Sequence, residues 1–252
     1  MTLLAPKQRQ EQIARKRRVV LRWMREYTWT HTDVLQALLR YSSRRAVEVT
    51  LKKMERDGLI KSAIIKVVYS RSVRLWGLTH NGMHYAFDSN EPLESIAVFE
   101  PSKVAASRLE HDLDIQMLHA RTIQIGWKYW KPGTLLAETL SAQALKIPDA
   151  VAMNSTGEIV ALEIERTLKS TKRYQELLVS YLRGRKLGLW ERILYLSPNS
   201  TLVARIERAF HNIKTASYQG ETFQVTQGHL EPFTFMTYDA VFETNEKFKV
   251  TI

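Results

Sequence analysis

Three carboxylates on one short segment are the residues of this chain best suited to chemistry. Asp149, Glu163 and Glu165 lie within residues 146–170, KIPDAVAMNSTGEIVALEIERTLKS, where short apolar runs flank a turn cluster at residues 154–157. This pattern predicts a hairpin in which Asp149 lies opposite the strand end that carries both glutamates. Because alternate residues of a strand share a face, the glutamates point to the same side. Such a carboxylate set predicts a site for Mg²⁺ or Mn²⁺.

Two lysines follow the hairpin closely. Lys169 and Lys172 stand at the start of a helix predicted over residues 170–186, where positive charge opposes the helix dipole. The placement favours a phosphate site beside the carboxylates; ion pairs with Glu163 or Glu165 are the alternative.

A second set of candidates lies on a helix predicted over residues 104–126. Glu110 and His111 would approach the carboxylates if this helix packs with that edge toward the hairpin. A lone histidine among apolar residues is more often structural, so a packing role for His111 is the alternative.

The chemistry expected of this site is attack at phosphorus. Metal-bound water would attack in line while a nearby lysine neutralises the developing charge. Tyr174 is the alternative nucleophile, although its spacing on the predicted helix is also that of a packed core residue.

The elements that must position these residues form a predicted second domain over residues 104–252. Their order is α-β-β-β-α-β-α-β. The later elements are a strand at 134–142, the hairpin, the helix at 170–186, a strand at 192–198, a helix at 201–216, and strands at 223–225 and 233–238.

A separate DNA-binding domain is predicted over residues 1–88. Three helices, at residues 8–27, 30–39 and 44–58, precede two strands around a turn at residues 69–72. This is the winged-helix pattern, in which the third helix enters the major groove and the wing touches the backbone. The predicted base readers are Arg44, Arg45 and Glu48, and the predicted supporting contacts are Lys52, Lys53, Tyr69 and Arg71. An acidic segment with two prolines, residues 89–103, is the predicted linker.

The charge balance favours a polyanionic partner. The 252 residues contain 37 Lys and Arg against 26 Asp and Glu, a net charge of +11. Nucleic acid is the first partner to consider and an anionic membrane surface the second. The chain has no cysteine, which excludes disulfides and Cys-ligated metal centres. With no long apolar run and a charged N-terminus, we expect a cytoplasmic protein.

The order of elements in the second domain resembles the restriction-endonuclease-like PD-(D/E)xK nucleases. Asp149 follows Pro148 on the second strand, and Glu163-x-Glu165 lies on the third. The family pattern has lysine where this chain has Glu165. The resemblance implies an α+β chain of two domains, a winged helix-turn-helix followed by a nuclease domain whose mixed sheet is flanked by helices. It also implies that Lys169 or Lys172 supplies the missing cation.

Across nearly its whole length the chain resembles the replication-relaxation proteins, and among them the MobC-type relaxases of mobilizable plasmids. The strings LWGLTHNG, LEHDLDI and ALEIERTLKS carry this resemblance. It implies a protein that binds double-stranded plasmid DNA at a transfer origin and nicks one strand. The implied partners are an accessory mobilization protein and a conjugative coupling protein.

The sequence also bears on two other functional classes. Tyrosine relaxases bind metal through a His-hydrophobe-His pair, and the seven histidines of this chain contain no such pair. A non-catalytic regulator of plasmid replication or copy number, with a degenerate nuclease domain, is the alternative that Glu165 favours.

Overall fold

The computed structural model describes residues 5–67, 71–88, 90–92, 97–143 and 145–247. The chain forms two compact units, Met1–Ala120 and Arg121–Ile252. Both contain helices and strands, which confirms the predicted α+β class. In the described part of the chain, no helix has the length and apolar character needed to cross a membrane.

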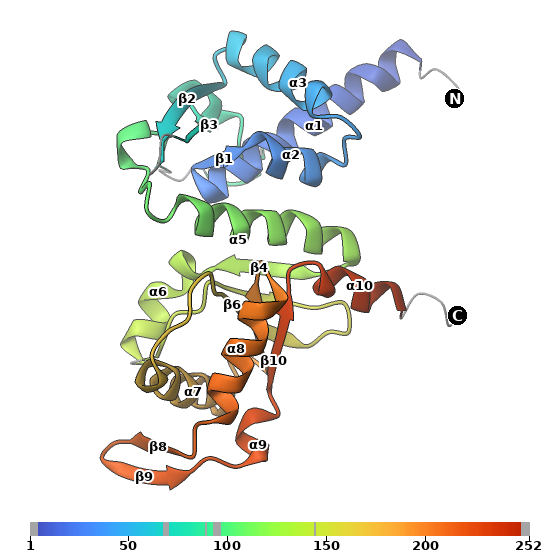
Figure 1. Cartoon of the computed structure of the whole chain (residues 1–252). Helices are drawn as coiled ribbons and strands as arrows, with labels where there is room; N and C mark the ends of the chain where they lie inside the picture. Colours follow the sequence, from blue (N-terminus) through green and yellow to red (C-terminus); the bar gives the residue numbers. More distant parts are fainter. Residues whose placement is uncertain (1–4, 68–70, 89, 93–96, 144, 248–252) are drawn as a thin grey trace. The chain divides into compact units, whose positions relative to one another are not determined.

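The first unit contains the predicted three helices and the two strands that follow them (Figure 1). Its sheet has the order β1-β3-β2, with antiparallel neighbours throughout. The elements are α1 (Pro6–Tyr27), β1 (Trp29–His31), α2 (Thr32–Leu39), α3 (Arg44–Arg56), β2 (Ile60–Lys66), β3 (Ser72–Leu78), α4 (His80–His84), the 3₁₀ turn η1 (Pro101–Lys103) and α5 (Leu109–Thr122).

Local signals set the ends of α3. The Ser43 side chain accepts a hydrogen bond from the Ala46 amide and caps the helix start. After the helix, Gly58 adopts a φ of +70°, a conformation that glycine takes without steric cost. Val47, Leu51 and Met54 recur at helical spacing and are fully buried against α1 and α2. These features place α3 where the sequence predicts it.

The helix α5 packs on the first unit. Leu113 and Met117 contact the core formed by α1, α2 and α3, and Leu109 packs beside Phe99. The Gln116 amide group also donates a hydrogen bond of 3.0 Å to the Trp29 carbonyl. The sequence places the second domain from residue 104, whereas the compact units divide after Ala120 because of this packing.

The second unit is built on a five-stranded sheet with the order β10-β7-β6-β5-β4. The pairs β4–β5 and β5–β6 are antiparallel, and β6–β7 and β7–β10 are parallel. The elements are η2 (Ile123–Ile125), β4 (Lys128–Pro132), α6 (Gly133–Ala142), β5 (Ala150–Met153), β6 (Ile159–Ile164), α7 (Thr171–Lys186), β7 (Arg192–Ser197), α8 (Ser200–His211), β8 (Thr215–Tyr218), β9 (Glu221–Gln224), α9 (Gln227–Leu230), β10 (Phe233–Thr237) and α10 (Ala240–Lys247).

One predicted strand is wrong. Residues 134–142 form the helix α6, and the strand of this region is β4, immediately before it. Leu136 and Leu140 are four residues apart, so a helix brings both onto the core of the second unit. The short apolar run is compatible with the spacing of a strand or of a helix, and the packing of the second unit stabilises the helix.

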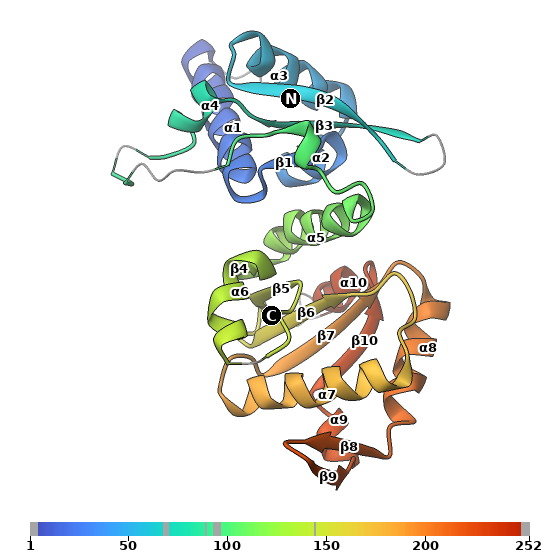
Figure 2. The same cartoon turned by 90° about the vertical axis from the view of Figure 1, so that its left-hand side faces the viewer.

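Two helices cover one face of the large sheet. α7 runs along it, as Figure 2 shows, and α8 packs beside α7. The core beneath them is aromatic: Tyr195 and Phe210 have ring centroids 4.9 Å apart in an edge-on arrangement. Tyr181 packs against Trp190 at 5.5 Å, and the Trp190 ring nitrogen donates to the Tyr181 carbonyl. The inward side chains of β6 therefore point into a densely packed layer.

This packing predicts a steric effect at Gly184 of α7. A Cβ atom at Gly184 would lie 2.0 Å from the Trp190 ring, so Gly184→Ala overpacks the core. We expect a loss of about 1–3 kcal/mol in the free energy of unfolding, measured by urea denaturation. Gly228→Ala is the matched control, because its new Cβ would have its nearest neighbour at 3.8 Å. An equal loss in both variants would contradict this packing.

Candidate active site in the second unit

The predicted hairpin brings Asp149 to the end of β6. Its amide donates to the Leu162 carbonyl at 3.0 Å, and its Oδ2 atom accepts a hydrogen bond of 2.7 Å from the Ile164 amide. Ala150 is paired with Leu162 in the antiparallel register. Asp149 thus lies across from the strand end that carries Glu163, as the sequence predicts.

Glu163 is buried beneath α7, with 3% of its surface exposed. Its Oε1 atom accepts hydrogen bonds from the Tyr181 hydroxyl and from Lys146 Nζ, the latter at 3.0 Å. The pKa of this carboxyl is raised from 4.5 to about 7. Burial is the largest cause and the negative charge of Asp149 acts in the same direction, while Lys146 acts in the opposite direction. Asp149 and Glu163 are therefore an interacting pair of like charges.

Glu165 follows β6 directly and is also buried, with 4% exposed. Its amide donates to the Leu196 carbonyl at 2.8 Å, and its side chain forms an ion pair with Lys169. The sequence left two roles open for Lys169, a phosphate contact or an ion pair with a glutamate. The structure contains the ion pair, with Glu165. Lys172 is exposed on the first turn of α7.

Two residues of this cluster were missed in the sequence. Lys146 stands three residues before Asp149, outside the predicted strand, and its amide is held by the Ser180 hydroxyl at 2.6 Å. Tyr181 lies on the apolar stripe of α7, and its spacing indicates core packing alone. The spacing of a helix stripe shows which residues face the sheet, but it does not show which sheet residue each one meets.

Two buried hydroxyls on β7 line the same face of the sheet. In the part of the chain that the structure describes, Tyr195 Oη and Ser197 Oγ have no hydrogen-bond partner. Burial raises the pKa of Tyr195 well above 10, and the charge of Glu163, its neighbour in the parallel register, raises it further. The interior next to the glutamates is therefore polar but incompletely hydrogen-bonded.

The Asp149–Glu163 pair is chemically suited to a divalent cation. A dication would favour the ionised form of Glu163, which burial and Asp149 disfavour. Mg²⁺ commonly uses one or two carboxylates and completes its shell with water and substrate phosphates. Among the described residues, no group of three or more His, Asp and Glu side chains is arranged to hold a metal ion. Of the predicted metal-binding carboxylates, Asp149 and Glu163 lie close enough to interact electrostatically.

The remaining candidates for the active site have other contacts. Glu110 lies on α5 of the first unit and forms an ion pair of 3.4 Å with Arg71 of the predicted wing. His111, beside it, is half-buried. Tyr174 is fully buried, and its hydroxyl accepts a hydrogen bond from the Lys169 amide, which is the setting of a structural tyrosine.

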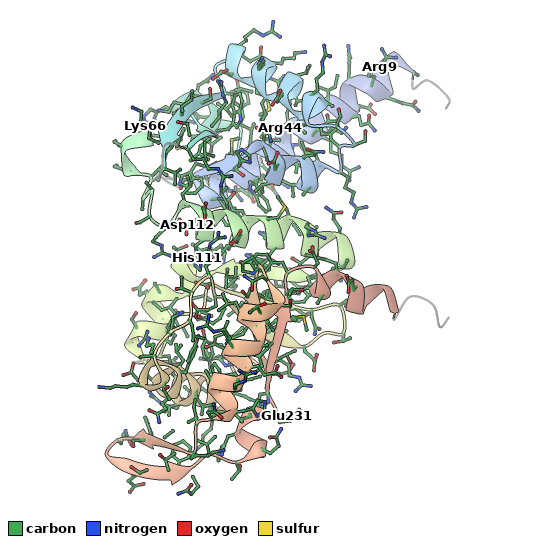
Figure 3. All side chains as sticks on the ribbon, viewed as in Figure 1. Arg9, Arg44, Lys66, His111, Asp112 and Glu231 are labelled. Atoms are coloured by element: carbon green, nitrogen blue, oxygen red, sulfur yellow. The ribbon has the colours of Figure 1, made fainter. Side chains whose placement is uncertain are left out.

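The predicted base readers lie on the first turns of α3. Arg44 pairs with Asp33 and with Glu48, the latter at 3.2 Å. Arg45 is exposed on the same turn. Lys52 and Lys53 are exposed further along α3, and Tyr69 lies outside the described residues. Figure 3 shows Arg44 on this part of the first unit.

No family model, no curated protein and no solved structure matches this chain.

The raised pKa of Glu163 predicts a pH-dependent stability. Between pH 4.5 and 7 the folded state binds more protons than the unfolded state, so stability falls as pH rises. Glu163→Gln keeps an acceptor for Tyr181 and Lys146 but does not ionise. Relative to this variant, we expect the parent chain to lose about 1–3 kcal/mol between pH 5 and 7 in urea denaturation. The exposed Glu138→Gln is the control and should keep the parent's pH dependence.

Proposed function

We propose that this chain is a plasmid-mobilization relaxase, which uses a divalent metal to nick one strand of DNA at a transfer origin. The observation that carries the proposal is the position of Asp149 and Glu163 on the sheet. Three antiparallel strands, β4, β5 and β6, are followed by a helix and a parallel strand, β7. Asp149 precedes the second strand and Glu163 lies near the end of the third, as in the restriction-endonuclease-like nucleases.

In this proposal Asp149 and Glu163 hold Mg²⁺ or Mn²⁺. The ion would act as a Lewis acid at the scissile phosphate and lower the pKa of bound water. The cation that the family places two residues after the glutamate is absent, because Glu165 stands there. Lys146 and Lys169 supply positive charge instead, each within ion-pair distance of one glutamate. Their side chains are about a third exposed, at 27% and 31%, and so remain accessible from solvent.

The first unit supplies DNA recognition in this proposal. Three helices and a two-stranded antiparallel hairpin are the parts of a winged helix, with α3 as its recognition helix. Ser43 begins α3 so that Arg44 and Arg45 lie on its first turn, the part that meets base edges. The substrate would be double-stranded plasmid DNA, and an accessory mobilization protein and a conjugative coupling protein would act with the chain.

A nicking assay tests the catalytic half. Supercoiled plasmid carrying its own transfer origin should become open circular with Mg²⁺ or Mn²⁺ and stay supercoiled without metal. Asp149→Asn and Glu163→Gln should each lower the nicking rate by at least about 100-fold, because each removes a charge that holds the metal. Both should leave DNA binding intact, and Glu138→Gln should leave both properties intact. An unchanged supercoiled band at every metal concentration would contradict the proposed nicking activity.

A second candidate function is a non-catalytic DNA-binding regulator of plasmid replication or copy number. The contacts of the glutamates favour it: Lys146 pairs with Glu163 and Tyr181 donates a hydrogen bond to it, and Lys169 pairs with Glu165. Such internal pairing stabilises a fold without metal. Under this alternative, the two carboxylate variants would leave every function of the chain unchanged.

DNA recognition by α3 predicts a position-dependent effect of arginine removal. Arg45→Ala should weaken binding to the cognate site by about 1–3 kcal/mol, measured by fluorescence anisotropy on a labelled duplex. Arg56→Ala is the matched control, because Arg56 is an exposed arginine at the other end of α3. A larger loss of binding free energy from Arg56→Ala than from Arg45→Ala would contradict the proposal that the N-terminal end of α3 contacts the bases.

A further inference from the structure

None of the described residues of the first unit buries the first half of α1. Every residue from Lys7 to Arg15 is exposed, whereas Val20, Leu21 and Met24 in the second half are buried in the core. Figure 3 shows Arg9 near the end of α1, away from the body of the first unit. An isolated helix of this length is marginal in water, so the folded core supports this segment only from its C-terminal end.

The cations of α1 fall into two groups. Those near the core are engaged: Lys16 lies 3.9 Å from the centre of the Tyr41 ring, and Arg17 pairs with Asp57. Arg22 and Arg25 pair with Asp88 and Glu91. Among the described residues, Lys7, Arg9, Arg15 and Arg18 form no ion pair, and the segment has one acid, Glu11. The cations of α1 that form no ion pair among the described residues therefore all lie between Lys7 and Arg18.

Three of these free cations share one face of the helix. Successive residues of an α-helix are rotated by about 100°, which places Lys7, Arg15 and Arg18 within about 80° of one another. Val20 and Met24 face the opposite side, toward the core. The three cations span about 16 Å along the axis, the length of roughly five base-pair steps. Arg9 lies outside this stripe.

The same face does not continue as a basic surface toward the C-terminal half of α1. There a cleft of about 1070 Å³ between α1 and α4 is lined by acids, including Asp57, Asp88 and Glu91, as well as by Arg17 and Arg18. Of the two arginines, Arg17 pairs with Asp57, whereas Arg18 forms no ion pair among the described residues. The acids of the cleft would repel phosphate. A polyanion is therefore attracted to the face that runs from Lys7 to Arg18 and not to the acids of the cleft.

We propose that the N-terminal part of α1, up to Arg18, is an arm that binds the phosphate backbone of duplex DNA through Lys7, Arg15 and Arg18. The proposal rests on the DNA-binding half of the proposed function and extends the contact beyond α3 and the hairpin. The two ends of α3 lie beside the base of the arm, because Tyr41 and Asp57 contact Lys16 and Arg17. The arm reads no sequence and adds affinity that depends on salt.

The salt dependence of binding tests the arm. Each phosphate contact contributes about 0.9 to the slope of log K against log salt concentration. The triple variant Lys7→Gln, Arg15→Gln, Arg18→Gln keeps helix-forming side chains and should lower this slope by about 2–3. At 100 mM salt we expect at least a tenfold weaker binding, for cognate and unrelated duplexes alike. Circular dichroism should show an unchanged helix content.

Two controls distinguish the effect of the arm on DNA binding from the effect of the chain's net charge. A second triple variant, Lys128→Gln, Lys186→Gln, Arg208→Gln, removes the same charge from exposed positions of the second unit and should keep the parent's slope. Arg9→Gln should change the slope less than Arg15→Gln, because Arg9 lies off the stripe. Equal slopes for both triple variants would overturn the arm. So would tighter binding to vesicles containing phosphatidylserine than to duplex DNA.

The outcomes for the arm and for the proposed function are distinguishable. If the parent chain does not nick DNA, the proposed catalytic activity is wrong, and the salt slope can still be measured to test the arm. Failure of the parent chain to bind any duplex removes both. Binding by the parent with a slope that the arm variant retains removes the arm alone.

Discussion

The burial of Glu163 under α7 is the constraint on which the second unit depends. A carboxylate in this position must be hydrogen-bonded or neutralised, because its charge is desolvated on every side. Tyr181 donates from the helix above it and Lys146 from the loop beside it. The same residue therefore joins β6, α7 and the loop before β5, and its geometry is fixed by the packing of all three.

The same constraint would serve a catalytic glutamate and a structural one. The features that would tune a catalytic glutamate are burial, a neighbouring aspartate and an adjacent lysine. These same features satisfy a structural glutamate. The unpartnered hydroxyls of Tyr195 and Ser197 lie on the same face and leave the polar interior incomplete. In the proposed relaxase, Asp149 and Glu163 would hold the metal ion, and Lys146 would remain beside them as a source of positive charge.

The elements with strong local signals were predictable. Ser43 and Ser170 cap α3 and α7 through their side chains, and both helices begin where the sequence places them. The turn around Gly157, which has a φ of +93°, sets the β5–β6 hairpin, and Asp149 follows from its register. Residues 134–142 were mispredicted because a short apolar run does not distinguish a strand from a helix. The division after Ala120 depends on which core receives α5, and that is a property of the fold.

The sequence by itself determined the α+β class, the hairpin, the shared side of Glu163 and Glu165, and the excess of positive charge. These follow from periodicity, caps and composition, which are local or additive properties. Only the tertiary structure decided what the carboxylates meet. Lys146 pairs with Glu163 and Lys169 pairs with Glu165. Tyr181 lies on the apolar stripe of α7, whose other residues pack in the core, and it donates a hydrogen bond to Glu163. Such partners are separated by up to 18 residues along the chain, and only the packing of α7 on the sheet brings them together.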